Sequence, residues 1–300
     1  MYDHLLQPIQ LGPTNLRNRV FSPPHGTTLG HDGVVTDKLI AYHQARARGG
    51  VGLIVLEGMT LHPSYGYKES FLYAGSDDII PGMKKLGEAC RQFDTPVFGQ
   101  LFHAGRAVRL SVDGSRPITY SASDIPDERY RVVSVPMPNA MVWEIIHSYA
   151  AAAARLAESE LDGVEILASM GYLIGQFLNP FTNHRDDEFG GSFENRMRLL
   201  REIVLHTRRQ IGTDKTLGVR ITLDEKIEKS LDPVDVVRVC QVLEEDNHVD
   251  YFSVISGSTA SPEGWIHVFP PHVCSPCVCC KRRSDAQKSG QQTGTGGREN

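Results

Sequence analysis

Polar side chains interrupt or end several apolar segments of the 300-residue chain, where they could support chemistry. These residues are Ser22, Glu57, Gln100, Ser169 and Arg220. If the apolar segments are parallel strands, their carboxyl ends meet at one edge, and the chemistry of a (β/α)8 barrel takes place at that edge. The pattern therefore predicts a site built from several strand ends.

The segment 171–196 reads GYLIGQFLNPFTNHRDDEFGGSFENR and is half apolar, half charged. Asn179-Pro180 and Gly190-Gly191 argue against a continuous helix. A solvated surface loop has no need of the apolar run 172–178. We therefore expect a strand-to-helix connection that is built over the site.

Apolar strands alternate with amphipathic helices along most of the chain. The first predicted strand ends near residue 24. The other predicted strands cover 51–59, 96–102, 163–168, 216–222 and 249–258. The predicted helices cover 36–48, 77–93, 144–161, 192–211 and 232–246. Such alternation indicates an α/β fold with a parallel sheet. We favour a (β/α)8 TIM barrel over an open sheet, because no glycine-rich fingerprint follows the first strand. About six of the eight βα units are evident, which would leave the first and last strands as exposed edges.

The bulk composition is that of a globular protein acting on small molecules. The net charge of −5 gives no electrostatic reason to expect nucleic acid or an anionic membrane as a partner. No apolar run approaches the roughly 20 residues of a membrane span, and the N-terminus lacks the basic and apolar regions of a secretory signal. We expect a cytoplasmic protein that can form a homo-oligomer. We also expect Cys90 and Cys240 to be buried thiols.

The βα pattern fails after about residue 260. We therefore divide the chain into an incomplete barrel domain, 1–265, and an irregular tail, 266–300. The tail is either disordered or the product of truncation or a shifted reading frame, and we favour the second interpretation. It holds four crowded cysteines, Cys274, Cys277, Cys279 and Cys280, but their spacing suits neither a 4Fe-4S cluster nor a zinc site, so we expect no metal.

Four motifs together resemble the old yellow enzyme family of FMN-dependent oxidoreductases. They are FSPPHGT at 21–27, GQLFHAGRAV at 99–108, NHRDDEFGGSFENR at 183–196 and GVRIT at 218–222, and the resemblance extends over roughly residues 1–270. The chain is most similar to the branch with 2,4-dienoyl-CoA reductase and trimethylamine dehydrogenase. The resemblance implies a (β/α)8 barrel with FMN at its C-terminal mouth and NAD(P)H as electron donor.

The resemblance also implies which residues hold the flavin. Arg220 matches an arginine that stabilises the negative charge of the reduced ring near N1, and Gln100 matches a glutamine that hydrogen-bonds the pyrimidine edge. Gly58 would let the backbone approach the ring. Ser22 and Pro23 match positions along the wall of the ring site. The alternative role for Arg220 is a salt bridge at the mouth of the barrel.

Two residues are candidates for catalysis. Tyr172 lies where the dienoyl-CoA reductases place a tyrosine that protonates the substrate carbon, and a phenol stays protonated at neutral pH. The alternative is a tyrosine that only packs the loop. His25 occupies a position where some relatives have a redox-tuning cysteine; it could touch substrate or flavin, or act from behind them. His267 could also reach the mouth of the barrel.

The chain departs from the family pattern at the substrate-binding histidine pair, whose positions hold Leu167 and Met170. We expect hydride transfer through flavin N5, with NAD(P)H-dependent reduction of an activated alkene as the activity. The alternatives are oxidation of an N-methyl amine and a non-catalytic remnant barrel. The phosphate-binding units seven and eight have no convincing counterpart, although GTGGREN at 294–300 faintly resembles the turn after strand seven. Asn183, Arg185, Asp187 and Arg196 match the family motif and are expected to brace the loop.

Overall fold

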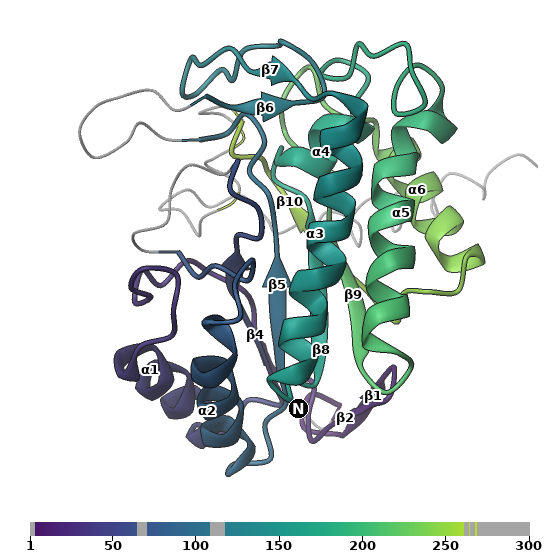
Figure 1. Cartoon of the computed structure of the whole chain (residues 1–300). Helices are drawn as coiled ribbons and strands as arrows, with labels where there is room; N and C mark the ends of the chain where they lie inside the picture. Colours follow the sequence, from purple (N-terminus) through teal and green to yellow (C-terminus); the bar gives the residue numbers. More distant parts are fainter. Residues whose placement is uncertain (1–3, 65–70, 109–117, 261–263, 265–267, 269–300) are drawn as a thin grey trace, which may run out of the picture.

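The computed structural model describes residues 4–64, 71–108, 118–260, 264 and 268. Their centre is a parallel sheet of six strands, which curves across the molecule (Figure 1). In spatial order the strands are β10 (Tyr251–Ser256), β9 (Thr216–Asp224), β8 (Gly163–Ala168), β5 (Val97–Leu101), β4 (Leu53–Met59) and β3 (Phe21–Ser22). The sheet order follows the order of these strands along the chain, as the wall of a βα barrel requires.

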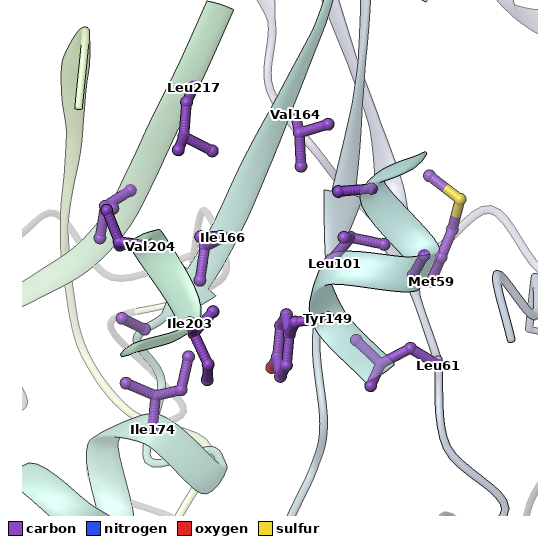
Figure 2. Packing of buried hydrophobic residues seen from close by; sticks show 14 of the residues in the cluster. Met59, Leu61, Leu101, Tyr149, Val164, Ile166, Ile174, Ile203, Val204 and Leu217 are labelled. Atoms are coloured by element: carbon purple, nitrogen blue, oxygen red, sulfur yellow. The ribbon is translucent and has the colours of Figure 1, made fainter. Parts of the chain in front are cut away.

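Helices follow the strands and cover one face of the sheet (Figure 1). They are α1 (Asp37–Arg48), α2 (Ile79–Arg91), α3 (Asn139–Glu158), α4 (Leu173–Leu178), α5 (Phe193–Ile211) and α6 (Pro233–Glu245). Alternate strand residues such as Leu101, Val164 and Leu217 point toward these helices and join one large apolar cluster with Tyr149 of α3 and Ile203 of α5 (Figure 2). This cluster is the core of the molecule. Within the described residues, none of the helices is long and apolar enough to cross a bilayer.

Three helices begin where the sequence predicts. The side chains of Thr36, Ser192 and Asp232 accept hydrogen bonds from the first free N–H groups of α1, α5 and α6. Helix α3 begins at Asn139, five residues before the predicted start at 144. Pro138 precedes its first turn, where a proline N–H is not needed, and Val142 within that turn is fully buried.

Two small sheets escaped the sequence analysis. The hairpin β1 (Ile9–Leu11) and β2 (Thr14–Leu16) lies beside the N-terminal ends of the barrel strands (Figure 1), where Thr216 Oγ1 donates to Leu11 O at 2.9 Å. The strands β6 (Tyr120–Ser121) and β7 (Val135–Pro136) pair within the connection between β5 and α3. Both pairs are two or three residues long, too short for a periodic pattern to reveal.

The described sheet has two open edges, as the count of six units predicts. Phe21 on β3 is 44% exposed and Val254 on β10 is 57% exposed. The boundary between a domain at 1–265 and a tail at 266–300 remains a prediction, because nearly all of the tail lies outside the described residues.

Candidate functional site

The sheet face opposite the helices carries a row of polar side chains from four strands. Gln100 Nε2 on β5 donates to Glu165 Oε1 on β8 at 2.7 Å, and Tyr251 OH on β10 donates to Glu165 Oε2 at 2.9 Å. Arg220 on β9 interacts electrostatically with the same carboxylate. Gln100 and Arg220 thus lie on the two strands that flank β8, and Glu165 connects them.

Burial governs the charges of this row. Glu165 is fully buried, and desolvation raises the pKa of its carboxyl, while Arg220 and the hydrogen bonds from Gln100 and Tyr251 oppose that shift. Desolvation also lowers the pKa of Arg220, and Glu165 counteracts it. Gly218 makes room for this arrangement, since a Cβ there would lie 2.1 Å from Tyr251 Cζ. The row is a compensated buried pair with defined donors.

Arg220 retains unused hydrogen-bonding capacity. Its Nη1 donates to Ser253 Oγ on β10 at 2.6 Å, whereas the buried Nε has no hydrogen-bond partner among the described residues. A buried donor without a partner is costly and is uncommon in folded proteins. The orphaned Nε therefore fits a ligand that presents an acceptor or a negative edge to this end of the sheet.

Gly58 and Tyr172 lie at the same end of the sheet as Gln100. Gly58 pairs with Gln100, and a Cβ at Gly58 would lie 2.9 Å from Phe102 Cδ1 and 3.3 Å from Gln100 Oε1. The ring of Phe102 in turn lies 5.4 Å from the ring of Tyr172, which is half-buried at the start of α4. Leu167 belongs to the same apolar cluster. The structure therefore connects Gly58, Gln100 and Tyr172 through Phe102.

Ser22, Pro23 and His25 lie along the β3 edge. Ser22 pairs with Ile54 on β4. The exposed His25 interacts through Nδ1 with Pro23 O at 2.9 Å and through Nε2 with Tyr42 OH of α1 at 2.5 Å. None of the hydrogen bonds recorded for His25 in the described part of the chain reaches Gln100, Arg220 or Tyr172.

Glu57, one of the polar residues at the strand ends, anchors this edge loop rather than pointing to a free site. Its two carboxylate oxygens accept from Thr27 N at 2.8 Å and Thr27 Oγ1 at 2.6 Å. Since Glu57 is buried, these two bonds hold the FSPPHGT segment against β4.

The predicted brace of the 171–196 segment is confirmed. Arg185 Nε donates to Asp187 Oδ1 at 3.0 Å, and its Nη1 donates to Met137 O at 2.6 Å. Asn183 Nδ2 donates to two carbonyl oxygens of the same loop, and Arg196 Nε donates to Leu178 O. The apolar run that we described as part of a loop is the short helix α4, which ends before Asn179-Pro180.

A cavity of about 760 Å³ opens beside this loop. It is bordered by Gly171, by Gln176 of α4 and by Arg106, which follows β5. Glu225, after β9, also borders it and is half-buried; desolvation raises the pKa of its carboxyl to about 7, opposed by a hydrogen bond with Ser258 and by Arg106. The cavity therefore reaches Gly171, the residue that precedes Tyr172 in the chain.

Sequence reasoning missed four residues of this region: Glu165, Tyr251, Arg106 and Glu225. One signal was present, because Glu165 is a lone acid inside the apolar strand GVEILA. Such a residue is almost never buried without a partner. His267 and the four clustered cysteines lie outside the described residues, so the expectations about them remain predictions.

A curved parallel sheet with alternating helices, in which the strand order follows the chain, defines a protein of the βα-barrel class. The chain belongs to the NADH:flavin oxidoreductase / NADH oxidase family, whose pattern matches residues 4–261. The orphaned Nε of Arg220 and the absence of a side chain at Gly58 fit the flavin that the family's name implies.

Similar proteins agree with this assignment. The chain is 34% identical over 273 residues to an NADPH dehydrogenase of Bacillus subtilis, covering 90% of this chain and 78% of that one. It is 31% identical over 274 residues to an N,N-dimethylglycine/sarcosine dehydrogenase of Chromohalobacter salexigens, covering 90% and 39%. The solved structure of a 2-naphthoyl-CoA reductase superposes with a TM-score of 0.81 at 28% identity, covering 87% and 42%. The chain thus spans about two fifths of the length of the last two.

Proposed function

We propose that the protein is an FMN-dependent oxidoreductase that uses NAD(P)H and reduces an activated alkene. The observation that carries this proposal is the row Gln100–Glu165–Arg220, in which one buried carboxylate accepts a hydrogen bond from the amide on β5 and attracts the guanidinium on β9. A bound flavin would supply hydride acceptance and donation at N5.

The residues of the row have separate tasks. Arg220 provides a fixed positive charge and the free Nε at the end of the ring that becomes negative on reduction. Gln100 provides an amide at the pyrimidine edge, held in position by its bond to Glu165. Because Glu165 fixes Gln100 and Ser253 fixes Arg220 before the cofactor enters, little reorganisation accompanies charge development. Gly58 leaves the space over Phe102 and Gln100 free of a side chain. At the β3 edge, Ser22 and Pro23 would form part of the wall of the ring site, with His25 near substrate or flavin.

Tyr172 is the proposed proton donor. Tyr172 is half-buried at the N-terminus of α4, its ring lies 5.4 Å from that of Phe102, and it follows Gly171, which borders the cavity. A neutral phenol can donate its proton to the substrate carbon as hydride arrives at the neighbouring carbon. Leu167, at one of the two positions of the family's histidine pair, is buried in the apolar cluster and offers no hydrogen bond to a substrate carbonyl.

The second candidate is oxidation of an N-methylated amine. The apolar Leu167 favours it, because an amine needs no donor to a carbonyl group. The similarity to an N,N-dimethylglycine/sarcosine dehydrogenase supports the same alternative. In this reaction hydride would leave the N-methyl carbon, and Tyr172 would not need to donate a proton.

Anaerobic absorbance spectroscopy of the purified, FMN-loaded protein tests these reactions. We expect NADPH to bleach the visible absorption band of the oxidised flavin. Addition of an activated alkene such as cyclohexenone should restore this band. Bleaching by an N-methylated amine but not by NADPH would establish the second reaction instead. A protein that does not acquire a flavin band would contradict both and indicate a non-catalytic barrel.

A further inference from the structure

The cavity beside Gly171 has a buried cation in its lining. Arg106 is 6% exposed, and its Nη1 donates to Ile125 O at 3.2 Å. Its buried Nε has no hydrogen-bond partner among the described residues. A guanidinium has five N–H donors in a planar fork that matches the two oxygens of a carboxylate. In the described residues, Nη1 thus has an acceptor and Nε has none.

The backbone of Arg106 is held in a fixed position. Gln176 Oε1 accepts from Arg106 N at 3.2 Å, and Gln176 Nε2 donates to Ala104 O at 3.0 Å. Gly105 before it has a φ of +62°, and a Cβ there would lie 2.0 Å from Gln176 Oε1. The side chain of Arg106 therefore extends from a turn that Gln176 fastens to α4, the helix whose N-cap is Tyr172. Such pre-organisation reduces the entropy lost when a ligand binds.

The nearest acids do not use the free donors of Arg106. Asp127 Oδ1 accepts from the backbone N–H groups of Arg129 and Tyr130, and its Oδ2 is buried without a hydrogen-bond partner in the described residues. Glu225 is linked to Ser258 Oγ, at 3.4 Å. Asp127, Glu128 and Glu225 all act on Arg106 electrostatically. They lower the cost of burying the guanidinium but leave its fork available to a ligand.

From this geometry, and resting on the proposed function, we propose that the substrate carries a carboxylate that binds Arg106 inside the cavity that Gly171 borders. Arg106 is then a residue that determines specificity, not one that takes part in hydride transfer. The carboxylate can belong to an α,β-unsaturated acid, the substrate class of the first candidate reaction. It can also belong to an N-methylated amino acid, the class of the second.

Binding of paired probes to the oxidised protein tests this proposal without turnover. Isothermal titration calorimetry would compare cinnamate with cinnamamide, and N,N-dimethylglycine with its amide. In each pair only one member has a carboxylate. We expect the wild type to prefer the carboxylate of at least one pair by about tenfold to a hundredfold, the range of a charge-assisted hydrogen bond. The preferred pair identifies the substrate class.

Arg106→Gln should abolish this preference, and Arg106→Lys should retain part of it. The matched control is Lys229→Gln, which removes the same charge at the exposed rim of the cavity, where water screens it; the preference should stay within about twofold. Circular dichroism and thermal melting verify that each variant folds. Equal affinity of the wild type for both members of each pair would overturn the proposal even if Arg106→Gln fails to fold.

A preference that survives Arg106→Gln in a folded variant would also overturn it. The two proposals fail separately. If the flavin band bleaches with NADPH but no carboxylate preference exists, the proposed function stands and Arg106 has no role in specificity. If carboxylates bind through Arg106 but no flavin is acquired, the proposed function fails and the anion site remains.

Discussion

At the scale of single residues, Glu165 decides how the candidate site is built. A lone carboxylate inside an apolar strand is unfavourable unless donors and a cation compensate it. Gln100, Tyr251 and Arg220 provide that compensation from three other strands. Its hydrogen bond fixes the amide of Gln100, and its charge attracts the guanidinium of Arg220, so the acid acts as a positioning residue for the group at the pyrimidine edge.

Tyr172→Phe separates the two half-reactions. Loss of the phenol should slow alkene reduction by about a hundredfold or more, the usual contribution of a general acid. Reduction of the flavin by NADPH should keep its rate, because Tyr172 donates no proton in that step. Stopped-flow absorbance measures both rates. If the two half-reactions slow equally, Tyr172 positions the cofactor or packs the loop and is not the proton donor.

Binding of a carboxylate probe should depend on pH through Glu225. With its pKa raised to about 7, Glu225 becomes negative as the pH rises through neutrality, and the new charge opposes a ligand carboxylate. Affinity should therefore fall several-fold between about pH 6 and pH 8, and Glu225→Gln should remove this fall. The groups that face Glu225 or share its cavity are Arg106, Glu128, His184, Asp224, Lys226, Glu228, Lys229 and Ser258.

Calorimetric titrations at several pH values measure this dependence. A fall that persists in Glu225→Gln would assign the titration to another of these groups. Affinity that is constant across the range would contradict the account of Glu225 itself.

At the scale of elements, the segment between β8 and α5 positions the site. Arg185 ties this segment to the start of α3, through Met137 O and Asn139 Oδ1, while it also holds Asp187. Burial raises the pKa of Asp187, but the hydrogen bonds from Arg185 and Phe189 N–H prevail and leave that pKa below its usual value. The charged half of the segment is thus a clamp, and the apolar half is a helix packed on the core.

Removal of the clamp should destabilise the fold. The Arg185 side chain is 8% exposed, so Arg185→Ala leaves buried acceptors without donors and should cost about 3 kcal/mol of unfolding free energy. Arg198→Ala, which removes an exposed arginine 3.9 Å from Glu188, is the control and should cost less than about 0.5 kcal/mol. Urea unfolding measures both. Similar losses for the two variants would contradict the clamp.

The order of the elements could be predicted from sequence, but the pairings across the sheet could not. Continuous apolar runs and capping residues such as Ser192 and Asp232 are local signals, and they placed α5 and α6 to within a residue. The bonds that join Glu165 to Gln100 and Tyr251 bridge 65 and 86 residues of sequence. Such contacts depend on strand register, which no local pattern specifies.

At the scale of the whole molecule, the described sheet has two edges that differ from its centre. β8 is hydrogen-bonded on both sides, and its residues are all buried. β10 pairs with β9 alone, and its residues are half-buried or exposed. Family resemblance and topology agree that further βα units would complete a barrel at this edge.

Hydrogen–deuterium exchange should follow this gradient. Amides of β8 and β5 should exchange most slowly, and those of β10 should exchange faster, because an edge strand opens without disrupting the core. Mass spectrometry of peptic fragments resolves these strands. Exchange in β10 as slow as in β8 would contradict an open edge and indicate that another strand covers it.

The central claim is that Gln100 and Arg220, which lie on the two strands that flank Glu165, hold the edge of a flavin ring. The most direct test is to titrate free FMN with the apoprotein and to measure the quenching of flavin fluorescence. Arg220→Lys keeps a charge beside Glu165 but removes the Nε donor and should weaken FMN binding by about tenfold. Saturable binding by the wild type and this loss in a folded variant are the predicted results. Absence of quenching by the wild type, or equal affinity in Arg220→Lys, would contradict the claim.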